Sequence, residues 1–269
     1  MARMMVRVLG CGDAFGSGGR LQSCFCLDTG DERVLIDCGA TAMIAMRRHD
    51  IDPVTIDAVV LSHLHGDHFG GVPLMLLEAQ FVSQRDRPLT IAGPPGTRDR
   101  LEQAMEVMYP GSSDIPWRFP LAFVELTAGR IDRVGAVSVL PVEVEHPSGA
   151  PAFALRLGCG DQVIAYSGDT EWTEALPGLA HDADLLIMEC FGFTLACKSH
   201  MDYRTLRARL PELGARRTVL THMGQEMLDR LDQVDVETAF DGMVIELPDP
   251  PVSLAPPGPL LPRQAALGG

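Results

Sequence analysis

The sequence lacks the features that mark secreted, membrane-spanning and cysteine-ligated zinc proteins. Its seven cysteines include no C-x-x-C pair, which argues against a zinc ribbon or a thioredoxin-like site. No apolar run reaches about 18 residues and no signal-peptide hydrophobic region is present, so we expect neither a membrane span nor secretion. An odd number of cysteines without these signals indicates reduced, buried thiols in a cytoplasmic protein.

The sequence also has too little basic charge for a broad grip on nucleic acid. It contains 36 acidic and 22 basic residues, which gives a formal net charge of −14. Binding along a phosphate backbone requires arrays of lysine and arginine. We therefore expect no extended nucleic-acid interface, whereas bound divalent cations would offset part of the negative charge.

The sequence has enough apolar residues to form a sizeable hydrophobic core, since 46% of its 269 residues are hydrophobic. Apolar runs of strand length alternate with helical patterns, which favours packed layers of sheet and helix. We expect one domain over residues 1–247 and a Pro-rich C-terminal tail over 248–269. The predicted strands are 4–9, 33–36, 58–61, 137–144, 152–157, 162–166, 184–188 and 217–220, the predicted helices are 40–48, 71–83, 97–108 and 202–210, and 110–120 is a predicted surface loop.

One short segment carries the strongest chemical signal. His63, His65, Asp67 and His68 follow an apolar strand within six residues. Three imidazoles and a carboxylate pack poorly, because each needs a hydrogen bond or a metal once it is buried. His63 and His65 point to the same side of an extended chain. We expect Gly66 to turn the chain so that Asp67 and His68 face a second position nearby.

Three further candidate ligands share one context, because each follows a predicted strand. They are His146, Asp169 and His222. Side chains at the ends of adjacent rigid strands converge with little loop ordering, as a metal site requires. Together with the histidine-rich segment they make seven ligands, which is the number that a dinuclear site needs.

These elements resemble the metallo-β-lactamase superfamily, whose signature H-x-H-x-D-H matches residues 63–68. The resemblance implies an α/β (α+β) fold, the four-layer αββα metallo-β-lactamase sandwich, with the site at one edge of two sheets. Asp169 stands where the zinc β-lactamases carry a cysteine, so antibiotic hydrolysis is disfavoured. By position in the family pattern, His63, His65 and His146 hold one metal, Asp67, His68 and His222 hold a second, and Asp169 bridges the two.

A centre with two such metal ions is typical of hydrolases. Two cations about 3.5–4 Å apart share a water, lower its pKa towards neutrality and neutralise charge on a phosphoryl or carbonyl oxygen. Imidazole ligands suit Zn²⁺, and the two carboxylates widen the choice to Mn²⁺ or Fe²⁺. We expect two divalent metal ions, with zinc as the first choice.

Two stretches indicate a branch of the superfamily. The run 9–20 and the segment Lys198-Ser199-His200-Met201 resemble the phosphodiesterase branch, which includes ribonuclease Z and the cyclic phosphodiesterase of the carbon–phosphorus lyase pathway. This resemblance implies that His200 donates a proton to the leaving oxygen and that Glu189 orients it. Asp67 joins these two as a catalytic residue. The alternative is that His200 caps a helix that begins near Asp202.

The sequence departs from ribonuclease Z in one place. Bacterial members carry a long tRNA-binding arm between the His and Asp elements, whereas His146 and Asp169 here are separated by two predicted strands. We therefore favour a small or cyclic phosphodiester as the substrate. A tRNA 3′-processing-like endonuclease and an ester, thioester or sulfate ester hydrolase on the same scaffold are alternatives.

A different class of enzyme, an iron-dependent oxidoreductase, is also an alternative. Diiron oxygen-reducing relatives carry a Glu where His65 stands and a fused flavin domain, for which no length remains. Relatives in the phosphodiesterase branch are often dimers, so the resemblance allows a homodimer.

Overall fold

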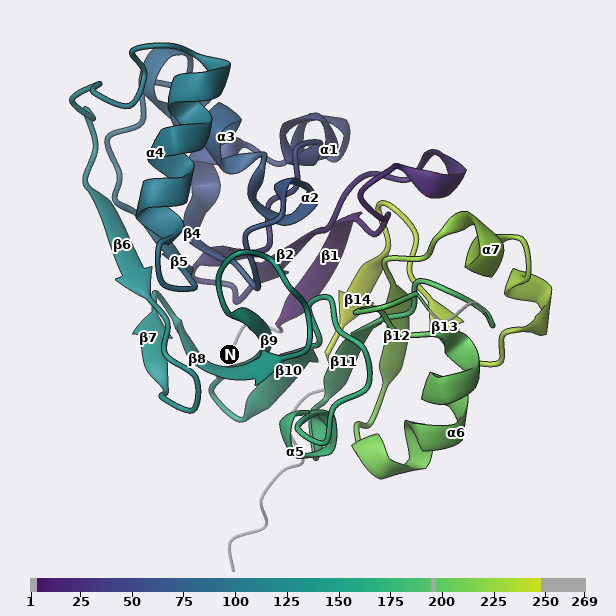
Figure 1. The fold of residues 1–269 in the computed structure, drawn as a ribbon. Coiled ribbons are helices and arrows are strands. Elements are labelled where there is room, and N and C mark those ends of the chain that lie inside the picture. Colours follow the sequence, from purple (N-terminus) through teal and green to yellow (C-terminus); the bar gives the residue numbers. More distant parts are fainter. Residues whose placement is uncertain (1–3, 195–196, 248–269) are drawn as a thin grey trace, which may run out of the picture.

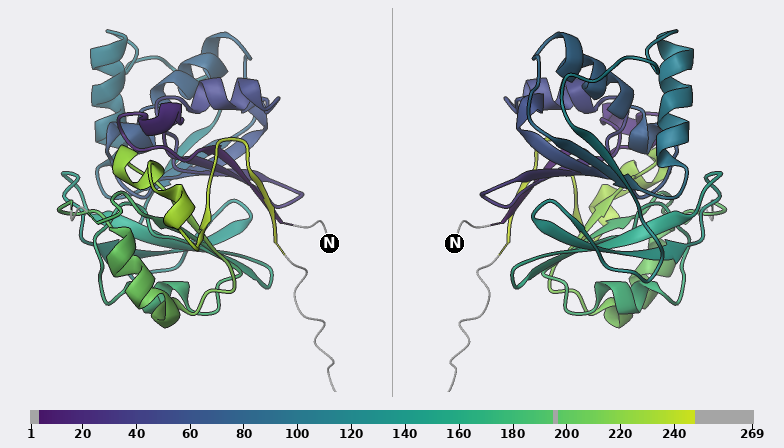
Figure 2. Two further views of the ribbon diagram at one scale, coloured as in Figure 1. Left: turned by 90° about the vertical axis from the view of Figure 1, so that its right-hand side faces the viewer. Right: turned by 90° about the vertical axis from the view of Figure 1, so that its left-hand side faces the viewer.

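A computed structural model describes residues 4–194 and 197–247, and they form four layers. Two seven-stranded sheets face each other, and helices cover the outer face of each sheet (Figures 1 and 2). The order of the first sheet is β14 (Val244–Glu246), β1 (Met5–Gly10), β2 (Cys24–Asp28), β3 (Arg33–Ile36), β4 (Ile56–Val60), β5 (Leu89–Gly93) and β6 (Leu121–Glu125). The order of the second is β13 (Glu237–Thr238), β12 (Thr218–Thr221), β11 (Leu185–Glu189), β10 (Gln162–Tyr166), β9 (Ala152–Cys159), β8 (Val137–Val144) and β7 (Asp132–Val134).

Each sheet is antiparallel in one half and parallel in the other. In the first sheet, β3 to β6 pair in parallel, and in the second, β10 to β13 do so. Parallel neighbours place their carboxyl ends at the same edge of a sheet. Residues that follow β4, β10, β11 and β12 therefore emerge close together.

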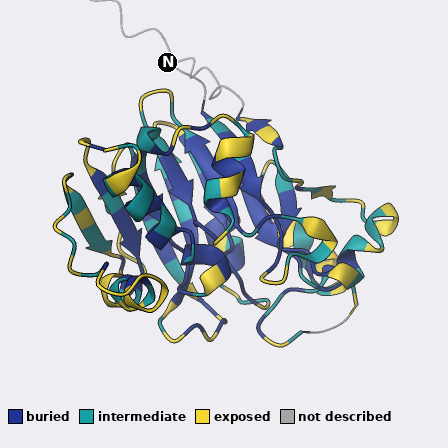
Figure 3. Ribbon diagram, turned by 90° about the horizontal axis from the view of Figure 1, so that it is seen from above, coloured by how far each residue is buried: buried dark blue, intermediate teal, exposed yellow. Residues whose placement is uncertain are grey.

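Alternation along the strands builds the cores on both faces of each sheet. In β4, Ala58 and Val60 face the opposite sheet, whereas Val59 faces the helices. Strands buried on both faces are almost wholly apolar, and β4 and β11 follow this pattern apart from Asp57 and Glu189. Seen from above, the central strands are buried along most of their length (Figure 3).

The helices divide between the two outer faces. The first sheet is covered by α1 (Ala42–Arg48), α3 (Val72–Phe81) and α4 (Thr97–Met108), and the second by α5 (Leu176–Ala180) and α6 (Tyr203–Leu213). Short helices α2 (Gly66–Phe69) and α7 (Gln225–Leu228) lie near the sheet edge where the histidines gather. The turns η1 (Ser17–Gly19), η2 (Pro53–Thr55) and η3 (Leu231–Gln233) complete the elements.

The predicted four-layer sandwich is confirmed, and the predicted elements lie within a few residues of the observed ones. Strands β5, β6, β7, β13 and β14 and helices α5 and α7 were not predicted. Each has at most five residues, and β6 is a half-exposed edge strand without clear alternation. The predicted change of chain direction at Gly66 is made by a short helix, and Asp67 and His68 do face the second group of candidate ligands. Gly66 begins helix α2, because the carbonyl of His65 accepts the amides of His68 and Phe69.

Two expectations concern the ends of the chain and the membrane. The Pro-rich tail over 248–269 lies outside the described residues, so the division at 247 stays a prediction. Among the residues that the structure describes, no helix is long and apolar enough to cross a bilayer.

Candidate metal centre

Six of the eight histidines gather where the carboxyl ends of strands from both sheets meet. His63 follows β4, His146 follows β8 and His222 follows β12. Asp169 follows β10 after a tight turn at Gly168, which has a φ of +57° and whose Cβ, if present, would lie 2.7 Å from the carbonyl oxygen of Phe153. Only glycine fits this position, and it turns Asp169 into the centre.

The first group of ligand atoms comes from His63, His65 and His146, and these atoms lie within 4.8 Å of one another. Nε2 of His146 is 3.0 Å from Nδ1 of His65. The ring of His63 packs edge-on against both, with centroid distances of 4.9 and 4.8 Å. The three nitrogens therefore converge on one point.

The second group consists of Asp67, His68, Asp169 and His222. Oδ2 of Asp67 lies 3.2 Å from Nε2 of both His68 and His222. Oδ2 of Asp169 is 3.3 Å from Nε2 of His68 and 3.2 Å from Nε2 of His222. The same oxygen lies 3.9 Å from Nε2 of His63 and of His146, so it stands between the two groups.

The polar atoms of the centre fit a metal ion, because several of them are buried without a hydrogen-bond partner. Nε2 of His63, Nε2 of His68 and Oδ1 of Asp169 have no hydrogen-bond partner. Buried polar atoms are nearly always satisfied, and an orphaned cluster needs an explanation. Imidazole and carboxylate are ligands of divalent transition metals, so the residues present fit such an ion.

Neighbouring groups fix how these rings face the centre. Nδ1 of His68 lies 2.7 Å from Asp37, Nδ1 of His63 lies 3.0 Å from Ser62, and Nδ1 of His146 lies 2.9 Å from the carbonyl of Ser199. Donation from Nδ1 leaves Nε2 unprotonated and directed at the metal position, which is how such partners orient ligating histidines.

Asp37 is a functional residue that the sequence reasoning missed. Its carboxylate accepts hydrogen bonds from the amide and hydroxyl of Ser62 at 2.7 and 2.8 Å and from the hydroxyl of Tyr166 at 2.8 Å, besides contacting His68. A signal was available, because Asp37 directly follows an apolar strand, β3, as the predicted ligands do. Asp37 and His222 adopt positive φ values of 56° and 55°. Such strain in residues other than glycine is typical of functional sites.

His200 and Glu189 form a pair beside the seven candidate ligands. Nδ1 of His200 lies 3.2 Å from both carboxylate oxygens of Glu189, which is fully buried at the end of β11. The amide of Thr170 also donates to Glu189. Burial raises the pKa of Glu189, and contact with Glu189 raises the pKa of His200 even though burial opposes it. The pair therefore retains a proton readily.

The alternative role of His200 as a helix cap is wrong. The side chain of Asp202 caps α6 by accepting the amide of Thr205 at 2.9 Å, whereas the amide of His200 donates to Cys197. The ring of His200 stacks on Phe191 at a centroid distance of 5.0 Å. Its position against the centre is thus set by Glu189 and Phe191.

The charges of the centre are arranged around Asp169. Burial opposes ionisation, but the imidazoles of His222 and His68 hold the pKa of Asp169 well below its usual range. Burial lowers the pKa of His63, so this ring stays neutral, as a ligand must be. Asp13, by contrast, lies outside the centre: it accepts the amides of Phe15 and Ser17 at 3.2 and 2.8 Å and serves a turn.

The fold and this site define a metal-dependent hydrolase of the metallo-β-lactamase fold, in its phosphodiesterase branch. The chain belongs to the family of the anti-Pycsar protein Apyc1, whose model matches residues 4–244.

Individual relatives agree with this placement. A ribonuclease Z of Methanosarcina acetivorans is 24% identical over 90% of this chain and 95% of its own, and the probable metallo-hydrolase YhfI of Bacillus subtilis is 26% identical over 90% and 96%. The crystal structure of YhfI matches with a TM-score of 0.74 at 23% identity, covering 91% of this chain and all of its own. Human tRNase Z, short form, matches with a TM-score of 0.71 at 26% identity, again over 91% of this chain and all of its own.

Proposed function

We propose that the protein hydrolyses a small or cyclic phosphodiester with two divalent metal ions. One observation carries the proposal: Oδ2 of Asp169 stands between a three-histidine group and a second group, with a Glu–His pair at the same centre. His63, His65 and His146 would hold one ion, Asp67, His68 and His222 the other, and Asp169 both.

In this proposal, residues of the chain orient the metal-binding imidazoles and donate a proton to the leaving oxygen. Bound divalent ions lower the pKa of a water and neutralise charge on a phosphoryl oxygen. Glu189 accepts from Nδ1 of His200, which leaves Nε2 of His200 as the atom that donates to the leaving oxygen. Asp67 belongs to this machinery as well, because its carboxylate contacts both His68 and His222 and so fixes their approach.

A small substrate fits the surroundings of the centre. The 146–169 stretch is taken up by β9 and β10, so no arm projects there. The net charge of −14 disfavours a long polyanion. Among the relatives are ribonucleases Z, and a diphosphatase from the PhnP family shares the fold with a TM-score of 0.72 at 18% identity, over 91% of this chain and 98% of its own.

Zinc is the metal that we infer. Five imidazoles and two carboxylates make a nitrogen-rich set, which suits Zn²⁺, while Mn²⁺ or Fe²⁺ are the alternatives. We also infer a reducing, cytoplasmic setting. All seven cysteines are free, and five of them are buried.

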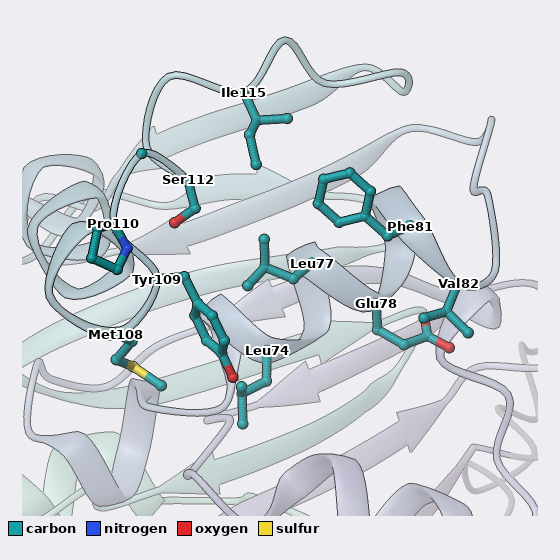
Figure 4. A pocket seen from close by; sticks show the side chains of 11 residues that line it. Leu74, Leu77, Glu78, Phe81, Val82, Met108, Tyr109, Pro110, Ser112 and Ile115 are labelled. Atoms are coloured by element: carbon teal, nitrogen blue, oxygen red, sulfur yellow. The ribbon is translucent and has the colours of Figure 1, made fainter.

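A homodimer is part of the proposal. Helix α3 is apolar on its outer face as well as its inner one, and together with the end of α4 it borders a hollow of about 730 Å³ (Figure 4). Phe81 is 61% exposed there. A two-fold interface presents one patch to itself, and an exposed apolar patch of this kind often marks a protein–protein contact. Phe81→Asp should lower the mass measured by light scattering, whereas Ile131→Asp, at a position 66% exposed elsewhere, should not.

The central test is metal-dependent turnover. Protein purified without chelator should contain about two equivalents of metal and hydrolyse bis(p-nitrophenyl) phosphate or members of a cyclic nucleotide panel. Chelation should abolish activity, and Zn²⁺ or Mn²⁺ should restore it. His63→Ala should show neither full metal content nor activity. Turnover of thioesters alone would support the ester hydrolase alternative and contradict the proposal.

A further inference from the structure

A pocket of about 430 Å³ opens beside His200. Three segments line it: the stretch that follows Asp169, the turn that leads into His200, and the first turns of α6. His200 lines the pocket, and its Nδ1 lies 4.0 Å from Oδ2 of Asp169, so the pocket adjoins the candidate metal centre. Its volume falls within the range of small-molecule sites, about 300–1,000 Å³.

Trp172 presents a fixed aromatic surface to this pocket. The guanidinium of Arg209 lies 4.9 Å from the centre of its ring, and the indole nitrogen donates to Glu174 at 3.2 Å. A cation over one face and a hydrogen bond at the edge hold the ring in one orientation. A ring held in this way is a platform on which a planar group can stack with little ordering cost.

Lys198 is the single lysine in the sequence, whose 22 basic residues are otherwise arginines. It is exposed, and within the described ranges it makes no ion pair or hydrogen bond. Two carboxylates also border the pocket and keep their negative charge: Glu171 accepts a hydrogen bond from the amide of Ser199 at 3.3 Å, and Asp202 accepts one from the hydroxyl of Thr205 at 2.7 Å. Lys198 is the ammonium in the lining that can attract an anionic group of the substrate despite them.

The turn that carries Lys198 is fastened to the metal centre. The carbonyl of Ser199 accepts Nδ1 of His146, and Ser199 holds a positive φ of 68°. Nδ1 of His200 is bound to Glu189, so its Nε2 lies on the side of the ring away from Glu189. A leaving group that takes a proton from His200 must lie next to this ring, and the pocket is the hollow that adjoins it.

We propose that this pocket is the leaving-group subsite, in which Trp172 stacks on a planar aromatic group of the substrate, such as a nucleobase, and Lys198 attracts its phosphate charge. The inference rests on the proposed function, because it assumes that His200 faces the leaving side. It goes further in naming what sets substrate specificity: an aromatic group, held by Trp172, on the alcohol whose oxygen leaves phosphorus. In a cyclic phosphate this oxygen takes the proton from His200 and stays attached to the product through the ribose.

The binding test uses fluorescence, because the chain has two tryptophans. A non-hydrolysable phosphorothioate cyclic nucleotide, added to the metal-loaded full chain, should quench the emission. Trp172→Phe should remove the quenching. Trp117→Phe, at the tryptophan near α4, should keep it. Quenching that survives in Trp172→Phe and disappears in Trp117→Phe would overturn the subsite.

The kinetic test compares a nucleoside 3′,5′-cyclic phosphate with the base-free ribose 3′,5′-cyclic phosphate. Trp172→Ala should lower kcat/KM for the nucleotide by about 5- to 150-fold, mainly through KM, which is the range expected for one base–aromatic stack. The same variant should keep kcat/KM for the base-free substrate within about 2-fold of the value for the unmodified protein. Lys198→Gln should lower kcat/KM for both substrates by about 2- to 5-fold at low salt. Lys198→Arg, which keeps the positive charge, should have kcat/KM values close to those of the unmodified protein.

The outcomes separate this inference from the proposed function. Hydrolysis with no discrimination by Trp172→Ala between the two substrates would overturn the subsite and leave the hydrolase intact. Nucleotide-specific quenching of Trp172 without any phosphodiester turnover would support the subsite while the proposed function fails. Circular dichroism of each variant checks that folding is unchanged.

Discussion

Nδ1 of His68 lies 2.7 Å from Oδ2 of Asp37, and both side chains are fully buried. The contact matters because His68 faces Asp67 and Asp169 with its other nitrogen. Asp37 thus fixes a ring of the second ligand group without being a ligand itself. Its carboxylate is in turn held by Ser62 and Tyr166.

Asp37→Asn should lower the affinity for metal by about 10- to 100-fold, the usual cost of losing a partner of a ligating histidine. The amide keeps the shape of the side chain but cannot accept from all the donors that now surround it. Competition with a chromophoric chelator measures the affinity. Tyr166→Phe is the control, since it removes one hydrogen bond to the same carboxylate and leaves His68 in contact with Asp37. It should lower the affinity for metal less than Asp37→Asn does. Equal affinity in Asp37→Asn and the unmodified protein would contradict this role.

Asp169→Ala should disrupt the metal centre far more than His49→Ala. The carboxylate of Asp169 faces the imidazoles of both groups, whereas His49 lies outside them, beside Gly242. Elemental analysis after dialysis should find metal lost from Asp169→Ala, with activity lost alongside, and full metal in His49→Ala. If both variants keep the same metal content and activity, the bridging assignment is refuted.

His200→Ala should keep its metals and lose rate by about 10²–10⁴-fold on a substrate with a poor leaving group, the usual contribution of a general acid. The loss should shrink when the leaving group is p-nitrophenolate, because that anion departs without a proton. Steady-state rates on both substrates provide the measurement. Glu189→Gln should follow the same trend, since it removes the charge that orients His200. A proportional loss on both substrates, or loss of metal, would mean that His200 is structural or a ligand.

Two of the seven thiols should react in the native protein. Cys159 and Cys197 are partly exposed, and the other five are buried. Burial raises the pKa of Cys26 and Cys38 to about 12, so these thiols remain protonated at neutral pH and react slowly. Titration with a chromogenic disulfide should give two fast equivalents, and seven after unfolding. A variant with Cys159 and Cys197 replaced by alanine should show no fast phase. More than two fast equivalents in the folded protein would contradict the burial of the others.

Much of the architecture could be predicted, because apolar strand-length runs and helical patterns mark the buried elements directly. Strand β4 and the polar cluster after it illustrate the case: the apolar run 58–61 followed by imidazoles predicts a buried strand that ends at a metal site. Strand β6 shows the limit. It is a half-exposed edge strand paired with β5 alone, so neither alternation nor burial marks it in the sequence.

The candidate ligands could also be predicted, since all seven lie in the two groups that the structure brings together. The residues that orient them were harder to find. Asp37 was overlooked although it follows a strand, because it has no neighbouring histidine to draw attention to it. Ser199 contributes through its backbone carbonyl, and no sequence pattern specifies which carbonyl a ring will meet. The helix at Gly66 was missed because a four-residue helix has no periodicity to detect.

The origin of the ligands in both sheets has a mechanical consequence. His63, His65, Asp67 and His68 follow β4 of the first sheet, and His146, Asp169 and His222 follow β8, β10 and β12 of the second. Ions held by both sets would act as a cross-link between two sheets that are otherwise joined by apolar contacts and by hydrogen bonds such as that from Tyr166 to Asp37. Any opening that separates the sheets would then have to break coordination, so bound metal would make such partial unfolding rarer. Amides of β4 and β12 would become protected from exchange together, and the two halves of the sandwich would unfold as one unit.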